Sequence, residues 1–109
     1  MAFQQETGVR EKVLIRAPQG LSRQMVVDFI ERYRTSLPNL RDALDRSDYA
    51  QAKVFGHRLS GTGGAYGMPV LTELGAAIED AAAQKNKSEL EAQTEMFAAY
   101  LSRLEVLPD

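Results

Sequence analysis

The chain has 109 residues, a formal net charge of −2 and no cysteine. This length is enough for one hydrophobic core, and we expect residues 1–109 to form a single domain. The weak acidic balance argues against a nucleic-acid-binding protein, which usually carries a strong basic excess. The absence of cysteine excludes disulfides, zinc–thiolate sites and cysteine nucleophiles.

Nothing in the sequence indicates export or insertion into a membrane. The N-terminal residues lack the basic and then apolar pattern of a signal peptide, and no apolar run approaches the roughly 20 residues that span a bilayer. We therefore expect a cytoplasmic protein with no membrane partner. Since His57 is the single histidine and cysteine is absent, we also expect no metal site in the chain.

Residues 1–20 contain a short apolar run, Val13-Leu14-Ile15, which Pro18-Gln19-Gly20 follows. We expect them to form an extended or short helical N-terminal arm, with the first eight or so residues mobile. Residues 21–106 are helical in pattern almost throughout.

The first predicted helix spans residues 22–44, and Ser22 is its expected N-cap. Pro38 lies inside the stretch, and because the apolar pattern continues through it we expect one kinked helix rather than two. Apolar residues at steps of three and four indicate a single buried face. These are Met25, Phe29, Tyr33, Leu37, Leu40 and Leu44.

Three further helices follow after short turns. The second helix is capped by Ser47 or Asp48 and ends near residue 63. The third helix has Pro69 in its first turn and ends near residue 86. Ser88 and Glu91 form a capping-box pattern that opens the fourth. The predicted inner faces are Ala52, Phe55, Leu59 and Thr62, then Leu71, Leu74, Ile78 and Ala81, and last Phe97, Tyr100, Leu101 and Leu104.

Four helices with short connections predict an all-α fold, an antiparallel up-and-down four-helix bundle. Each predicted helix has one apolar face and no second one to bury. We therefore expect a monomer.

His57 lies two residues after Phe55 and two before Leu59. At about 100° per residue its side chain points about 180° from their average direction, away from the core. Arg58 lies about 100° to one side of it. The residues on the same outer stripe as His57 are Lys53, Ser60, Gly61 and Gly64.

Glycine inside a helix costs roughly 1 kcal/mol relative to alanine, and the predicted second helix contains Gly56 and Gly61. Gly61 leaves a bare patch beside the histidine that a partner could approach, whereas Gly56 could simply permit close helix packing. Counting residues from the turns places His57 level with Arg41 and Gly75, which we expect to flank the exposed surface. A lone exposed histidine is most often only a solvated polar side chain, so position alone does not assign a role.

The wider pattern is more specific. From the histidine onward the sequence resembles the histidine-containing phosphotransfer (HPt) family, whose motif runs His-x-Leu-Lys-Gly-Ser-Ala, then a glycine and a leucine-spaced helix ending Leu-Glu. The chain has His57-Arg58-Leu59-Ser60-Gly61-Thr62-Gly63, followed by Gly67, Leu71, Leu74, Ile78 and Glu79. The resemblance extends over residues 13–105.

The resemblance implies a phosphocarrier in a two-component phosphorelay, with His57 as the acceptor. The implied partners are receiver domains of response regulators and of hybrid histidine kinases. Such a carrier holds no cofactor and has no kinase or phosphatase activity, since the receiver brings the aspartate and the Mg²⁺. Ser60 stands where the family usually has a charge-neutralising lysine. We expect Lys53 or Arg58 to compensate, because a phosphoryl group carries close to two negative charges.

Two other interpretations remain open. One is a helical adaptor that binds a histidine kinase or receiver domain without carrying phosphate. The other is a generic helical bundle whose histidine is incidental.

Overall fold

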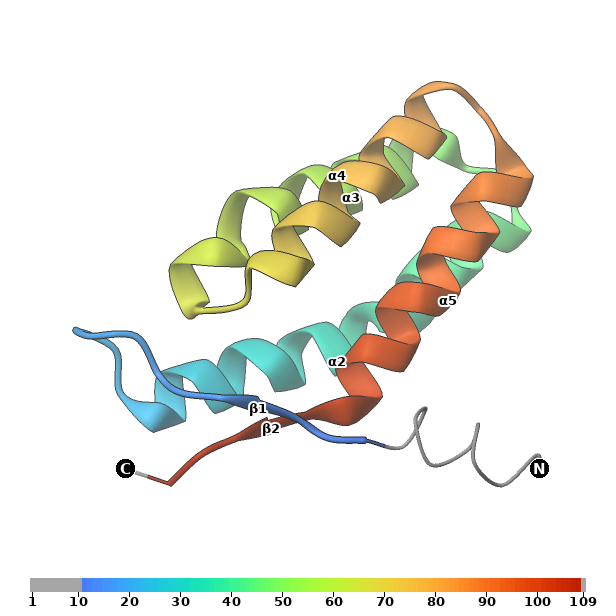
Figure 1. Ribbon diagram of the computed structural model, residues 1–109. Helices are drawn as coiled ribbons and strands as arrows, with labels where there is room; N and C mark the ends of the chain where they lie inside the picture. Colours follow the sequence, from blue (N-terminus) through green and yellow to red (C-terminus); the bar gives the residue numbers. More distant parts are fainter. Residues whose placement is uncertain (1–10, 109) are drawn as a thin grey trace.

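The structure, a computed structural model, describes residues 11–108, so the expected mobility of the first eight residues lies outside the described part. It is mostly helical, with α2 (Arg23–Asp45), α3 (Tyr49–Thr62), α4 (Pro69–Ala83) and α5 (Lys87–Arg103), and a 3₁₀ turn, η1 (Gly64–Tyr66), follows α3 (Figure 1). The four predicted helices are therefore confirmed. The purely all-α description is wrong in one respect, because two short strands are present: β1 (Val13–Ile15) and β2 (Leu104–Val106).

The helix starts follow from side-chain caps. The Ser22 hydroxyl accepts a hydrogen bond from the Met25 amide, and the Asp48 carboxylate accepts one from the Gln51 amide, both at 3.1 Å. Each cap satisfies an amide that the first helical turn leaves unpaired. The predicted Ser88–Glu91 capping box is wrong, because α5 begins at Lys87 and is capped by Asn86.

One hydrophobic core joins all four helices, and α2 continues unbroken through Pro38. The predicted inner face of α4 is buried at all four positions. On α2, however, Met25 is 48% exposed and Val26 is buried instead. Several other predicted core residues are only half-buried: Tyr33, Leu37, Phe55, Thr62 and Tyr100.

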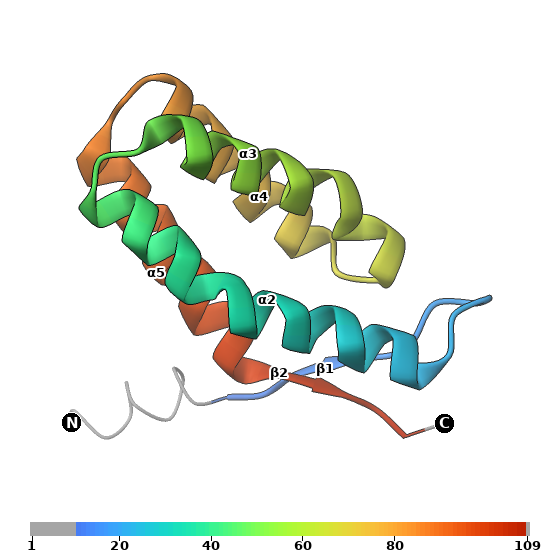
Figure 2. The same cartoon turned by 180° about the vertical axis from the view of Figure 1, so that it is seen from behind.

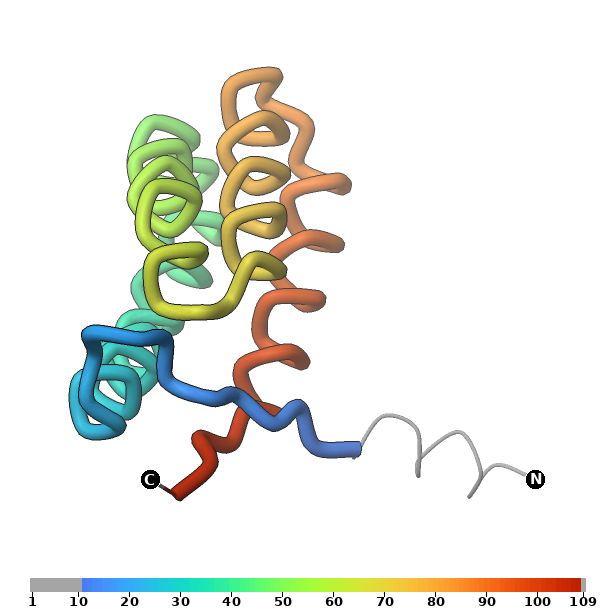
Figure 3. Tube along the Cα trace, turned by 60° about the vertical axis from the view of Figure 1, so that its left-hand side comes forward, coloured from blue at the N-terminus to red at the C-terminus, as the bar shows by residue number. Residues whose placement is uncertain are grey.

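The segments near the two ends of the described chain lie next to each other (Figure 3). They form a parallel strand pair, in which Val13 lies opposite Leu104 and Ile15 opposite Val106. The arm is thus extended over β1, as expected. The predicted continuation of the last helix to Leu104 is wrong. Leu104 fits a helical pattern, because Leu101 one turn earlier is also buried. It fits a strand pattern as well, because burial alternates from buried Leu104 to exposed Glu105 to buried Val106.

The switch from helix to strand is stabilised by an arginine of α2. The Arg34 guanidinium donates to the Leu101 carbonyl at 2.7 Å and to the Leu104 carbonyl at 3.0 Å. Leu101 lies in the last turn of α5 and Leu104 is the first residue of β2, so this arginine spans the point where the helix ends and the strand begins.

Candidate functional site

Two glycines bring α3 and α4 into backbone contact. These helices lie side by side when viewed from opposite directions (Figures 1 and 2) and form the most extensive helix–helix contact. A Cβ added to Gly56 would lie 2.5 Å from the Glu79 amide nitrogen, and one added to Gly75 would overlap the Ser60 backbone. The packing explanation of Gly56 is therefore confirmed. The expectation that Gly75 flanks an exposed surface is wrong, because Gly75 is buried between the helices.

This close approach places a carboxylate of α4 against the histidine of α3. The Glu79 carboxylate oxygen Oε2 lies 3.1 Å from His57 Nδ1, while the His57 side chain remains 76% exposed. A carboxylate only accepts hydrogen bonds, so in the neutral ring this contact places the proton on Nδ1. Nε2 then keeps its lone pair and has no hydrogen-bond partner among residues 11–108.

Glu79 is the site residue that sequence reasoning missed as a contact. The sequence pattern marks Glu79 only as the last residue of the leucine-spaced helix, and counting from the turn predicts Gly75 opposite the histidine. In the structure Gly75 does lie at this level, packed against Gly56 and Ser60, but it is buried between the helices, and Glu79 one turn further along α4 contacts the ring. Arg41 does not flank the histidine either, since its guanidinium pairs with Glu95 of α5 at 3.4 Å.

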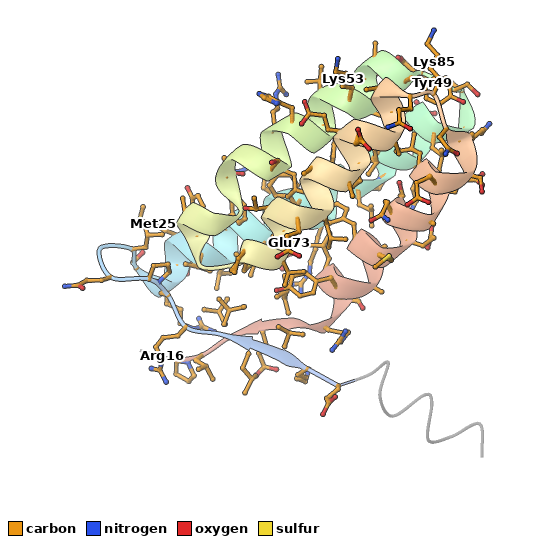
Figure 4. The ribbon with its side chains drawn as sticks, turned by 45° about the horizontal axis from the view of Figure 1, so that its top comes forward. Arg16, Met25, Tyr49, Lys53, Glu73 and Lys85 are labelled. Carbon is orange, nitrogen blue, oxygen red and sulfur yellow. The ribbon has the colours of Figure 1, made fainter. Side chains whose placement is uncertain are left out.

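The predicted outer stripe is largely exposed. Lys53, Gly61 and Gly64 are exposed and Ser60 is half-buried. Lys53 lies on the outer surface of α3 (Figure 4) and has no ion pair within the described part of the chain. A Cβ at Gly61 would meet no atom within 4 Å, so the bare patch beside His57 is confirmed.

Arg58 lies on the opposite flank of α3 from Glu79. Its side chain lines a groove between α2 and α3, together with Arg32 and Val54. The structure therefore separates the two cations proposed to replace the family lysine. Lys53 stays on the histidine's own stripe, and Arg58 belongs to the neighbouring groove.

The described residues contain no group of three or more histidine, aspartate or glutamate side chains arranged to hold a metal ion. Between residues 11 and 108 no helix has both the length and the apolar character needed to cross a membrane.

Comparison with protein families gives one match. The family model described as Hpt domain matches residues 24–107. This range includes His57 and all four helices, apart from Arg23 at the start of α2. Comparisons with curated proteins and with solved structures gave no significant match. Hpt domains carry phosphoryl groups in two-component phosphorelays, where they work with receiver domains and histidine kinases. The chain belongs to the Hpt domain family.

Proposed function

We propose that His57 accepts a phosphoryl group from the aspartate of one receiver domain and passes it to the aspartate of another. The observation that carries this proposal is the imidazole itself, 76% exposed, with Nδ1 beside the Glu79 carboxylate. Histidine is among the side chains that form covalent intermediates, and its neutral ring is the nucleophile. The chain itself has no kinase or phosphatase activity in this proposal.

The transfer uses the lone pair on Nε2. That pair attacks the phosphorus of the receiver's aspartyl phosphate, an N–P bond forms, and the P–O bond to the aspartate breaks. The aspartate carboxylate leaves with the bonding electrons. The proton on Nδ1 stays in its hydrogen bond to Glu79, whose negative charge stabilises the positive charge that develops on the ring. The reverse sequence returns the phosphoryl group to a receiver.

The transferred group also needs positive charge, because Ser60 supplies none. Lys53, one turn before the histidine on the same stripe, is the cation that this chain offers. The receiver provides the Mg²⁺, and the carrier binds no cofactor. Much of the catalysis then consists of positioning and charge neutralisation.

We further propose that residues 1–109 act as one antiparallel up-and-down bundle, monomeric and cytoplasmic, that does not bind nucleic acid. The net charge of −2 supports the last point. The burial of one apolar face per helix in a common core supports the monomer.

The test is phosphotransfer from a receiver labelled on its aspartate. We expect acid-labile, base-stable label on the wild-type chain and none on His57→Gln. His57 is the single histidine, so loss of the label assigns the acceptor without further mapping. Circular dichroism of His57→Gln provides the folding control. Equal labelling of the variant would reject the proposed acceptor.

Ser60 favours the adaptor as a second candidate, because a hydroxyl cannot neutralise a bound phosphoryl group as lysine does. The same experiment separates the two functions. An adaptor binds receivers in a pull-down but gains no label, whereas a carrier gains label at His57.

A bulky residue at the bare patch is expected to block the receiver. Gly61→Trp places an indole where a Cβ has no neighbour within 4 Å, so it changes access to His57 without disturbing the core. We expect receiver-to-carrier transfer to slow by about tenfold, equivalent to about 1.4 kcal/mol. Rapid-quench kinetics measure the rate, and an unchanged melting temperature is the control. Undiminished transfer would remove Gly61 from the interface.

A further inference from the structure

The sheet of β1 and β2 has two outer edges, and the edge of β1 is free. The strands are parallel, and the Leu107 amide donates to the Ile15 carbonyl at 2.8 Å. Along a strand, the backbone groups of successive residues point alternately to one side and to the other. Since the backbone groups of Ile15 face β2, the amide and the carbonyl of Leu14 face the outer edge. They have no hydrogen-bond partner among residues 11–108.

The outer edge of β2, by contrast, is occupied by side chains of α2. The Arg34 guanidinium donates to the Leu104 carbonyl at 3.0 Å, and the Arg23 guanidinium donates to the Val106 carbonyl at 3.2 Å. These are the two β2 carbonyls that the same alternation turns away from β1. A further strand could pair with β2 only by displacing both arginines, so β1 is the edge at which this sheet can be extended.

The exposed face of β1 carries an apolar side chain between two cations. Lys12, Leu14 and Arg16 alternate with the two residues of β1 that point toward the core, and Leu14 is 57% exposed. Arg16 is exposed and has no ion pair with residues 11–108. Lys12 pairs with Glu105 of β2 at 3.3 Å, where both side chains are more than half exposed. Figure 4 shows Arg16 beside β1 and well away from Lys53 of α3.

These charges decide which kind of strand fits the edge. A second copy of β1, paired antiparallel with Leu14 opposite Leu14, would place Lys12 of each copy opposite Arg16 of the other. Like charges directly opposite each other destabilise a strand pair, whereas opposite charges stabilise it. The edge is therefore protected against self-pairing, which is a common use of charged residues on edge strands. The strand that it favours has carboxylates at the two positions facing the cations.

We propose that the free edge of β1 binds an extended segment of a partner protein, in which an apolar residue lies between two acidic residues at alternate positions. The segment adds a third strand to the sheet. Its backbone pairs with the amide and the carbonyl of Leu14, and its apolar side chain covers the Leu14 side chain. Its two carboxylates lie opposite Lys12 and Arg16. The site uses no residue of the histidine stripe, so the proposal does not depend on the proposed function.

The test is a titration of the whole chain with the end-blocked peptide Ser-Glu-Val-Leu-Val-Glu-Ser, followed by proton–nitrogen NMR. Its leucine and two glutamates lie on one face of an extended strand. We expect the Leu14 amide to exchange freely with solvent in the free chain and to be protected when the peptide is bound. The control is the same peptide with lysine in place of both glutamates. We expect it to bind at least about tenfold more weakly.

Leu14→Pro tests the backbone pairing. Proline has no amide proton, but an edge strand tolerates it where the amide faces solvent, so β1 is expected to stay paired with β2. We expect peptide binding to be lost in this variant. Leu14→Ala is the matched control, because it shortens the side chain and keeps the amide, and we expect it to bind the peptide more weakly than the wild type. Thermal melting checks the fold of both variants.

Arg16→Glu tests the charges without altering the backbone. We expect it to weaken binding of the acidic peptide by about fivefold and to strengthen binding of the lysine peptide. Lys85→Glu is the matched control, since Lys85 is exposed between α4 and α5 and lies at the opposite end of the molecule from Arg16 in Figure 4. We expect it to bind both peptides as the wild type does.

Three results would overturn the proposal. The first is an acidic peptide that leaves the Leu14 amide of the wild type unprotected, and the second is equal binding of the two peptides. The third is protection of that amide in the free chain, which would show that the edge is already filled. Sedimentation then tells whether a second copy or another part of the same chain fills it. Labelling of His57 by a receiver tests the proposed function separately.

Discussion

Gly75→Ala is expected to lower the free energy of unfolding by about 1–3 kcal/mol. The new methyl group would overlap the Ser60 backbone and lie 2.8 Å from the Gly56 carbonyl oxygen. Backbone atoms cannot rotate away as a side chain can, so α3 and α4 must move apart. The loss outweighs the gain of about 1 kcal/mol in helix propensity that alanine brings. Urea denaturation followed by circular dichroism measures the change.

Gly61→Ala is the matched control for this experiment. It adds the same methyl group within a helix of the same pair, at a position with nothing within 4 Å. We expect it to leave stability unchanged or to raise it by up to about 1 kcal/mol. Equal stability of the two variants would contradict the close backbone packing of α3 and α4.

Glu79→Ala is expected to reduce the saturating rate of transfer to or from His57 by about tenfold, equivalent to about 1.4 kcal/mol. Removal of the carboxylate lets the ring rotate and place its proton on Nε2, which removes the nucleophilic lone pair. Glu79 acts through His57 and does not touch the phosphoryl group, so it is a positioning residue. We expect KM for the receiver to stay close to the wild-type value.

Glu79→Gln is the conservative control, because its amide oxygen accepts the same hydrogen bond from Nδ1. We expect it to transfer faster than Glu79→Ala, because the tautomer is kept, but more slowly than the wild type, because the amide lacks the negative charge. Nitrogen-15 NMR of the imidazole reports the tautomer directly, and with one histidine in the chain the signals need no assignment. The Nδ1–H form is expected to dominate in the wild type and Glu79→Gln and to decline in Glu79→Ala. Identical tautomers in all three proteins would refute the positioning role.

Helix packing and the candidate site depend on the same contact. Gly56 immediately precedes His57, and its missing side chain lets the Glu79 backbone approach α3. The same approach brings the Glu79 carboxylate to 3.1 Å from Nδ1. The glycine that permits this packing therefore also lets Glu79 contact Nδ1, which leaves Nε2 as the ring nitrogen without a hydrogen-bond partner in residues 11–108.

The sequence by itself determined what depends on local periodicity and capping. Steps of three and four predicted four helices and the inner face of α4, and residue type predicted the Ser22 cap, all of which the structure confirms. Of the two caps predicted for α3, Ser47 or Asp48, the structure has Asp48. The position of His57 between Phe55 and Leu59 was enough to predict an outward-facing ring, since side-chain direction follows from helix geometry alone.

Tertiary structure alone decided what depends on the register between helices and on contacts remote in sequence. His57 and Glu79 are 22 positions apart, so no local pattern links them, and counting from the turn could not tell which residues of α4 face inward between the helices and which reach the ring. The pairing of β1 with β2 is equally remote, and Leu104 fits the helical and the strand period alike. The α2–α3 groove needs side chains from two helices, so neither helix sequence reveals it.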